Sequence, residues 1–435
     1  VQRVSMPLLH QSDAEKVIDA VNPDVLASPS QKQKLFFLGG IPRPSVQFAA
    51  LNHSFESVWN NVACKYSAFN FVDLVRLLAA AVYGGKFTRG ESAGINNWTW
   101  GRLSDEGVCI LEGDPGCIRV PYSVFRLASE LSVPPDATKP QSCFAQNLKW
   151  MSKYVDNSLF TQEPWQLWER FGACFLALRV NAALILGYRE LSAADLLWPG
   201  GEITGCKHDV ALKPVEVHES VQSIKKTDME RTVNEKVDHR RKKWLDGDDG
   251  IYYVFVNGTS GKGVDIFMAL PLRDAGENGT TAMLVYVDQR KAVASLTLGQ
   301  KTSKAFIEKA KAIVPSDLPA GSKVVVGLFS LLATYDDLQQ SQLPEDSFVM
   351  SYARHESFHG SLSYHPACSP FVDVNFDNIS KLKLLPSIKT IAAAILEKRK
   401  ESHFKSLTEL QTFCLEHNVE ISDEDKSRMI ARRSV

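Results

Sequence analysis

Two neighbouring apolar segments carry polar residues of the types that hydrolyse phosphodiesters. Asp265 interrupts the segment VDIFMAL, and the next segment, TAMLVYVDQRKA (281–292), carries Gln289 and Lys291 near its end. Alternate side chains of a strand share a face, so Gln289 and Lys291 are expected to follow Val285 and Val287 on one face. Asp288 and Arg290 are expected on the other face. The pattern predicts an amide and an ammonium group close to a carboxylate on the adjacent strand.

This combination of groups suits hydrolysis assisted by a divalent cation. A carboxylate oxygen holds Mg²⁺, or the similar Mn²⁺, while water fills the remaining positions. The cation lowers the pKa of a bound water and neutralises charge at the phosphate. A lysine can orient that water or stabilise the developing charge. The residues therefore predict a Mg²⁺ or Mn²⁺ site around Asp265.

The surrounding segments predict a mixed α/β core that positions these residues. Runs of apolar residues with strand-like alternation or length predict strands, and an amphipathic segment predicts a crossover helix. The expected strands are 251–257, 263–271, 281–292, 323–332 and 347–353, with a helix at 303–314. Before them, residues 161–199 have apolar positions at helical spacing and predict one long helix.

The order of these groups resembles the restriction-endonuclease-like core named for its PD-(D/E)xK motif. Asp265 takes the place of the motif's Asp, and Gln289 and Lys291 take the place of (D/E)xK. The resemblance implies that Glu169, on the preceding helix, completes the site. The metal ligands would then be Glu169, Asp265 and Gln289. Gln289 replaces the more usual carboxylate, and an amide oxygen binds Mg²⁺ more weakly.

The C-terminal segment 372–410 resembles a helix-hairpin-helix module of DNA-binding proteins. Its apolar spacing and the sequence LLPSIK match the family's hairpin, although Ser387 and Lys389 stand where the family has glycines. Amides at the start of the second helix would then bind phosphate. The residues implied to contact DNA are Pro386, Ser387, Ile388, Lys389, Thr390, Lys398, Arg399 and Lys400. The alternative is an αα-hairpin that only packs.

The complete order of motifs is similar to the C-terminal portion of Crinkler effectors and the related retrotransposon hot spot proteins. In this interpretation, 1–50 is the helical tail of a truncated NTPase-like module, and an NTPase precedes the chain. Residues 51–150 form a winged-helix-like domain, most simply a spacer. Residues 161–365 form the nuclease core, and 370–435 the helix-hairpin-helix domain. The resemblance implies double-stranded DNA as partner and, for a secreted virulence effector, the host nucleus as location.

Other features limit the function without deciding it. The formal net charge is −1, so DNA binding must depend on local basic patches. One such patch, Arg240, Arg241, Lys242 and Lys243, fits a nuclear localisation signal, a phosphate contact or a solvated helix face. No apolar run approaches the length of a membrane span, and the eight cysteines contain no CxxC pair.

Three histidines, His355, His359 and His365, lie close together in the sequence. They are expected to make hydrogen bonds or to contact DNA rather than to hold structural zinc. Together the sequence predicts a Mg²⁺-dependent DNA endonuclease. The alternative is a catalytically inactive DNA-binding protein that alters host transcription through its helix-hairpin-helix.

Overall fold

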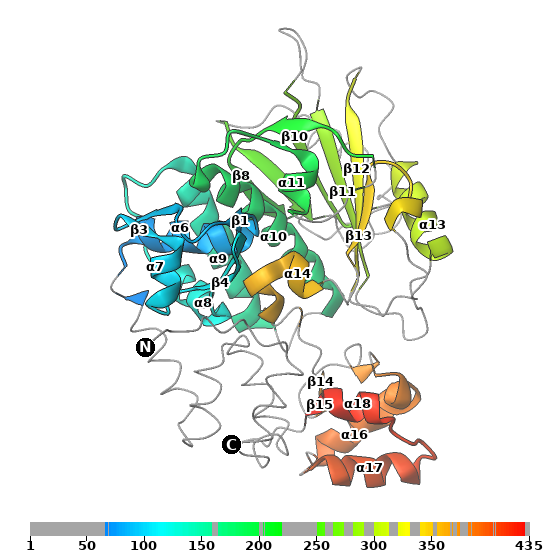
Figure 1. Ribbon diagram of the computed structural model, residues 1–435. Helices are drawn as coiled ribbons and strands as arrows, with labels where there is room; N and C mark the ends of the chain where they lie inside the picture. The colour runs from blue at the N-terminus through cyan, green and yellow to red at the C-terminus, as the bar shows by residue number, and fades with distance from the viewer. Residues whose placement is uncertain are drawn as a thin grey trace.

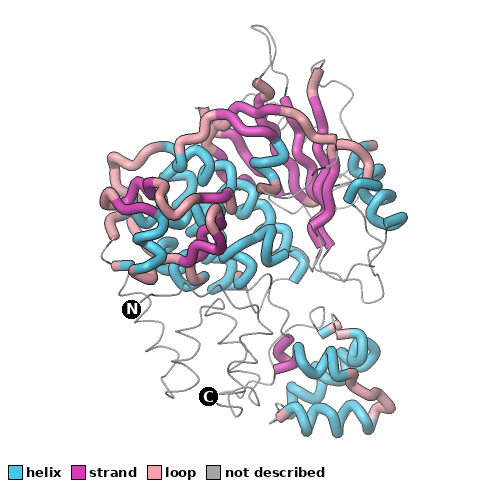
Figure 2. Tube along the Cα trace, in the orientation of Figure 1, coloured by secondary structure: helices cyan, strands magenta, loops and turns pink. Residues whose placement is uncertain are grey.

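The protein combines helices and strands in a mixed α/β architecture (Figures 1 and 2). The computed structural model describes the following residues: 66–67, 69–158, 164–199, 203, 205–219, 250–256, 264–273, 282–290, 300–312, 321–330, 340–350, 355–365, 368, 372–374, 382–383, 385–402, 404 and 406–430. Among these residues, no helix is both long enough and apolar enough to cross a bilayer. The seven cysteines in this part of the chain are all free thiols.

The first described region is a helical layer with small strands at its outer side. Its elements are α6 (Phe71–Tyr83), β1 (Lys86–Phe87), β2 (Ser92–Ile95), β3 (Trp98–Thr99), α7 (Trp100–Asp105), β4 (Ile110–Gly113), β5 (Gly116–Arg119), α8 (Tyr122–Ser129), α9 (Lys139–Ser158) and α10 (Pro164–Leu186). Within the segment predicted as winged-helix-like, α7, β4, β5 and α8 follow one another as a helix, two strands and a helix. β1 completes a three-stranded sheet in the order β1-β5-β4. Winged-helix function remains a prediction.

A six-stranded sheet forms the second layer. Its elements, with the helices that accompany them, are β8 (Val215–Glu219), β9 (Tyr252–Val256), β10 (Ile266–Pro271), β11 (Ala282–Arg290), α13 (Gln300–Lys311), β12 (Lys323–Ser330), β13 (Ser347–Met350) and α14 (His355–His359). The strand order is β13-β12-β11-β10-β9-β8. β10 is antiparallel to both of its neighbours, β9 and β11. The pairs β11–β12, β12–β13 and β8–β9 are parallel.

The sequence predicted most of this sheet but not all of it. Five predicted strands appear as β9 to β13, and the predicted helix at 303–314 appears as α13. The single helix expected over 161–199 is wrong in its second half. α10 ends at Leu186, and the short β6 (Glu190–Ser192) and α11 (Ala193–Leu197) follow. Neither β8, within its polar surroundings, nor the short β7 (Asp209–Ala211) was predicted.

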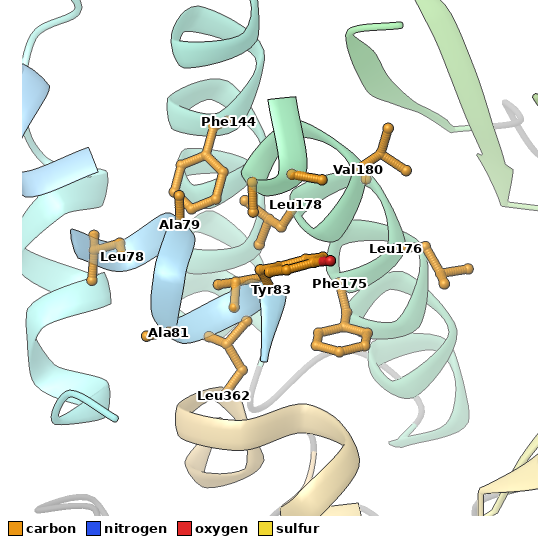
Figure 3. Close-up of a cluster of buried hydrophobic side chains, with 14 of the residues drawn as sticks. Leu78, Ala79, Ala81, Tyr83, Phe144, Phe175, Leu176, Leu178, Val180 and Leu362 are labelled. Atoms are coloured by element: carbon orange, nitrogen blue, oxygen red, sulfur yellow. The ribbon is translucent and has the colours of Figure 1, made fainter. Parts of the chain in front are cut away.

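The two faces of the sheet pack against different helices, which lie on opposite sides in Figure 1. Residues such as Ile266, Val285 and Phe329 share one continuous core with α6, α9 and α10. Residues of opposite parity, such as Ala269 and Leu328, pack with Ile307 of α13. In Figure 3, Leu176 and Val180 of α10 point away from α6, on the side of α10 opposite to the one that contacts α6. Because one core joins the first layer to the sheet, residues on either side of position 150 pack as one body.

The C-terminal helices have a hydrophobic core of their own. The elements are the 3₁₀ helix η5 (Pro386–Ile391), α16 (Ala392–Glu401), α17 (Leu407–Glu416), α18 (Asp423–Arg428) and the paired β14 (Val372–Asp373) and β15 (Met429–Ile430). The apolar positions that define the predicted hairpin pattern are buried together here: Leu385, Ile388, Ala392, Ile395, Phe404 and Leu410. The basic cluster Lys398-Arg399-Lys400 lies in the last turn of α16, and α17 follows Phe404.

Candidate active site

Asp265 lies where the side-chain alternation of its strand is interrupted. Val264 packs in the core that contains α13, whereas Ile266, two residues later, packs in the core that contains α10. On a regular strand, residues two apart share a face, so one extra residue is inserted here. Ile266 pairs with Val287, and the Asp265 N–H also donates to the Val287 carbonyl at 3.0 Å. Both residues therefore lie opposite Val287, and the half-buried Asp265 takes the place of a β-bulge.

The Gln289 position lies two residues further along β11, close to Asp265. In the parallel pair of β11 and β12, Gln289 aligns with Phe329. Phe329 is buried in the core that contains α10. Aligned positions of neighbouring strands share a face, so position 289 belongs to the α10 side of the sheet, as the alternation predicted. Lys291 follows β11 and lies outside the described residues.

Glu169 lies on the side of α10 that covers the centre of the sheet. With about 100° per residue, Glu169 falls within about 40° of Leu176 and Val180 on the helix surface. On one flank of this strip Asn181 bonds to β8, and on the other Phe175 packs on His359 beside β12. The Glu169 strip therefore runs between β8 and β12, over β9, β10 and β11, and its side chain is half-buried.

Aromatic contacts connect the first half of α10, which carries Glu169, to β12 through His359. The ring of Trp168, the preceding residue, is 5.7 Å from the His359 ring. The His359 ring is in turn 6.3 Å from the ring of Phe329, the residue aligned with Gln289. Phe175, almost two turns later on α10, also contacts the His359 ring, at 4.6 Å, so the 168–175 part of α10 lies beside this end of β12. Asp265 and position 289 lie close to each other at the Val287 register, and Glu169 belongs to the helix that covers this face of the sheet.

The predicted histidine group is buried beside this region. His355, His359 and His365 are at most 8% exposed. Burial lowers the pKa of His359 well below its ordinary value, and the nearby His355 and Arg179 act in the same direction. Its Nδ1 lies 3.2 Å from the His355 carbonyl. These histidines belong to the packed core, where they hold α14 against α10, and they do not present a DNA-contacting surface.

Buried Arg179 anchors the same aromatic region. Its guanidinium donates 2.6 Å hydrogen bonds to the carbonyls of Leu197 and Phe358. It also stacks over the rings of Phe175 and Phe358, with its central carbon 4.5 and 4.9 Å from the ring centres. Burial lowers its pKa to about 9. Arg179 therefore ties α10 to the end of α11 and to α14.

The hairpin amide expected to bind phosphate is occupied by a carboxylate of the protein itself. The Ser387 N–H donates to Asp425 Oδ2 at 2.7 Å, and Asp425 is 2% exposed. The Ser387 hydroxyl contacts the Ser422 hydroxyl at 3.2 Å. The expectation that this amide points outward is therefore wrong. A residue from α18 satisfies it, because α18 and the residue before it contact the start of η5.

The basic residues of the hairpin are partly neutralised by neighbours. Lys400 Nζ bonds to Glu397 at 2.7 Å, and Lys398 lies 3.7 Å from Glu401. Arg399 donates to the Val374 carbonyl at 3.1 Å. Of the other predicted DNA contacts, Ile388 is buried in the core, whereas Pro386, Lys389 and Thr390 are exposed. The local positive field is weaker than the sequence alone indicates.

One group of potential metal ligands was not found by sequence reasoning. Among the described residues, only Cys206, His208 and Asp346 bring three ligand atoms within 4.8 Å of one another. Burial raises the pKa of the Cys206 thiol to about 11, with a further contribution from Asp346. The spacing Cys-x-His was a signal in the sequence, but Asp346 follows 138 residues after His208. The predicted basic patch 240–243 and the segment 1–50 lie outside the described residues.

Comparison with known proteins gives no assignment. The chain matches no family model, no curated protein and no solved structure.

Proposed function

We propose that this protein is a divalent-cation-dependent nuclease that hydrolyses phosphodiester bonds of double-stranded DNA. Its site would be formed by Glu169, Asp265, Gln289 and Lys291 at one end of the six-stranded sheet. The order α10, β10, β11, α13 supports the resemblance to the restriction-endonuclease-like core. In that order, a helix with Glu169, a strand directly preceded by Asp265 and a strand with Gln289 are followed by a crossover helix.

The observation that carries the proposal is the register at Asp265. The bulge places Asp265 opposite Val287, and Gln289 follows two residues later on the adjacent strand. Neighbouring strands are about 4.8 Å apart and two residues span about 7 Å, so side chains from these positions can reach one ion. Bulges frequently occur beside active sites, where they redirect a side chain.

The donor atoms at these positions fit Mg²⁺ or Mn²⁺. Two carboxylates and an amide supply the oxygen ligands that hard cations prefer. When bound, such a cation would make water a stronger nucleophile and neutralise phosphate charge. Glu169 and Asp265 would hold the charge of the cation, and Gln289 would orient it with a neutral oxygen. Lys291 would stabilise the developing negative charge on the phosphate oxygens.

Plasmid nicking with point variants tests the proposal. The purified chain is incubated with supercoiled plasmid and Mg²⁺, with and without a chelator. We expect nicking that the chelator abolishes and that Asp265→Asn, Glu169→Gln and Lys291→Met each reduce by about 100-fold or more. The matched control is Asp288→Asn, which makes the same change one position before Gln289 and should stay within about twofold.

Each result has a defined meaning. Nicking that survives Asp265→Asn unchanged would show a contaminating or different nuclease and would reject the proposed site. Absence of nicking together with salt-sensitive duplex binding would favour the second function, a DNA-binding protein without cleavage. The Asp425 contact at Ser387 weakens that second function, because it places a negative charge where phosphate would bind.

A further inference from the structure

Cys206, His208 and Asp346 form a compact group at the β13 edge of the sheet. Their ligand atoms lie within 4.8 Å of one another, and His208 Nε2 is 3.1 Å from Asp346 Oδ1. All three side chains are half-buried. The group lies three strand positions from β10, about 14 Å across the sheet from Asp265. It is therefore separate from the proposed nuclease site.

Both chain segments that supply these residues are fixed by backbone hydrogen bonds. The His208 carbonyl accepts from the Ala193 N–H at 2.7 Å, and the Asp346 carbonyl accepts from the Val326 N–H at 2.9 Å. Gly205 has φ of 70°, and a Cβ added to it would lie 3.1 Å from Glu345. Glycine therefore lets the Cys206 segment approach the residue that precedes Asp346.

Asp346 itself has an uncommon backbone conformation. Its φ is 53°, in the left-handed region that few non-glycine residues adopt. Strained residues persist where the surrounding structure fixes them, and they are concentrated at functional sites. Here the conformation lies immediately before β13 and directs the carboxylate toward His208.

We infer that Cys206, His208 and Asp346 bind a zinc ion between the segment after α11 and the edge strand β13. A thiolate, an imidazole and a carboxylate are the ligands that Zn²⁺ prefers, with metal–ligand distances of about 2.0–2.3 Å. In tetrahedral geometry such ligand atoms are about 3.3–3.7 Å apart. The observed group needs only small side-chain movements to reach that spacing, and water supplies the fourth ligand.

The arrangement does not fit a cysteine nucleophile with a catalytic histidine. In such an enzyme the imidazole lies between the thiol and the carboxylate and takes the thiol proton. Here the Cys206 thiol and His208 Nε2 both approach the Asp346 carboxylate. The three groups converge on one point instead of forming a thiol–imidazole–carboxylate chain. They are therefore arranged as ligands around an ion.

The inference is tested by metal content and by the spectrum of the cobalt-substituted protein. We expect the full chain, purified without chelator, to contain about one zinc per chain by mass spectrometry. Replacing zinc with Co²⁺ should produce the intense near-ultraviolet absorption of a cobalt–thiolate bond. Cys206→Ser should abolish this absorption, and His208→Gln should lower zinc affinity by at least 10-fold.

Two controls keep the result interpretable. Cys117→Ser removes another half-buried thiol, far from the group, and should bind cobalt as the wild type does. Far-ultraviolet circular dichroism checks that each variant is folded. A folded wild-type chain that retains no zinc and gives no cobalt–thiolate absorption would overturn the inference. Equal absorption in Cys206→Ser would also overturn it. Both readouts are independent of DNA cleavage.

Discussion

The side-chain amide of Asn181 binds both backbone groups of Val215. Its Nδ2 donates to the Val215 carbonyl at 2.6 Å, and its Oδ1 accepts from the Val215 N–H at 3.0 Å. Asn147 of α9 donates to the same carbonyl at 2.9 Å and accepts from the Val217 N–H at 3.2 Å. Val215 begins the edge strand β8. Two helices thus satisfy backbone groups that an edge strand would otherwise expose.

Asn181→Ala should lower the free energy of unfolding by about 2–4 kcal/mol. The substitution removes the two hydrogen bonds to Val215 and a third to the Ala177 carbonyl, and it leaves the buried Val215 N–H without its partner. Chemical denaturation followed by circular dichroism measures the change. Asn147→Ala should have a smaller effect, since Asn181 still binds Val215. A combined loss equal to the sum of the two single losses would contradict the shared role of the two amides.

Arg179→Lys should destabilise the protein by about 2–3 kcal/mol. A lysine can reach one of the two carbonyls that the guanidinium binds but cannot also stack between two aromatic rings. Thermal unfolding measures the loss. The control is Arg189→Lys, at an exposed position, for which we expect a change below about 0.5 kcal/mol. An equally small effect at Arg179 would show that its buried contacts contribute little.

His359→Phe should make the protein less sensitive to acid. The folded protein keeps His359 neutral, because its pKa is well below the ordinary value. In the unfolded chain the imidazole takes up a proton below about pH 6.5. The unfolded state then binds more protons, so the free energy of unfolding falls as the pH falls. One pH unit below 6.5, His359 alone should cost about 1.4 kcal/mol.

The measurement compares melting temperatures of wild type and variant across this acid range. The control is His417→Phe, since this histidine is exposed at the end of α17. Identical pH profiles for wild type and His359→Phe would contradict the neutral, buried state of His359.

Asp425→Ala should free the Ser387 amide and strengthen binding of short duplex DNA at low salt. The carboxylate that now accepts this amide would be removed, together with its repulsion of phosphate. We also expect the C-terminal helices to lose about 1–3 kcal/mol of stability. Fluorescence anisotropy measures binding. The control Asp423→Ala removes the same charge from an exposed side chain. An equal gain in DNA binding in this control would show that the change in net charge, not the freed Ser387 amide, causes the gain.

The central strands could be predicted because their signal is local. β9 to β13 are apolar runs bounded by polar or glycine-containing segments, which packing on both faces of a sheet requires. β8, VEVHE, has only two valines, and its backbone is satisfied partly by Asn147 and Asn181 from earlier helices. The five residues of β8 contain no pattern that indicates these hydrogen bonds from Asn147 and Asn181.

The candidate sites depend on relationships that a linear pattern does not contain. Alternation assigns position 289 to the α10 side of the sheet, as the strand register does, but the contact of Asp265 depends on its register with Val287 on the next strand. Asp425 reaches Ser387 across 38 residues, and Asp346 reaches His208 across 138. These contacts are set by the three-dimensional path of the chain. The residue types were visible, and their partners were not.

The asparagine contacts to β8 also have a consequence for the order of folding. α9, α10 and β8 follow one another in the chain, whereas β9 begins at Tyr252, more than thirty residues after β8 ends at Glu219. During synthesis the helices and β8 emerge first, and Asn147 and Asn181 can bind Val215 before any neighbouring strand exists. Contacts between nearby segments form faster than distant ones. β8 would then act as a template on which the rest of the sheet assembles.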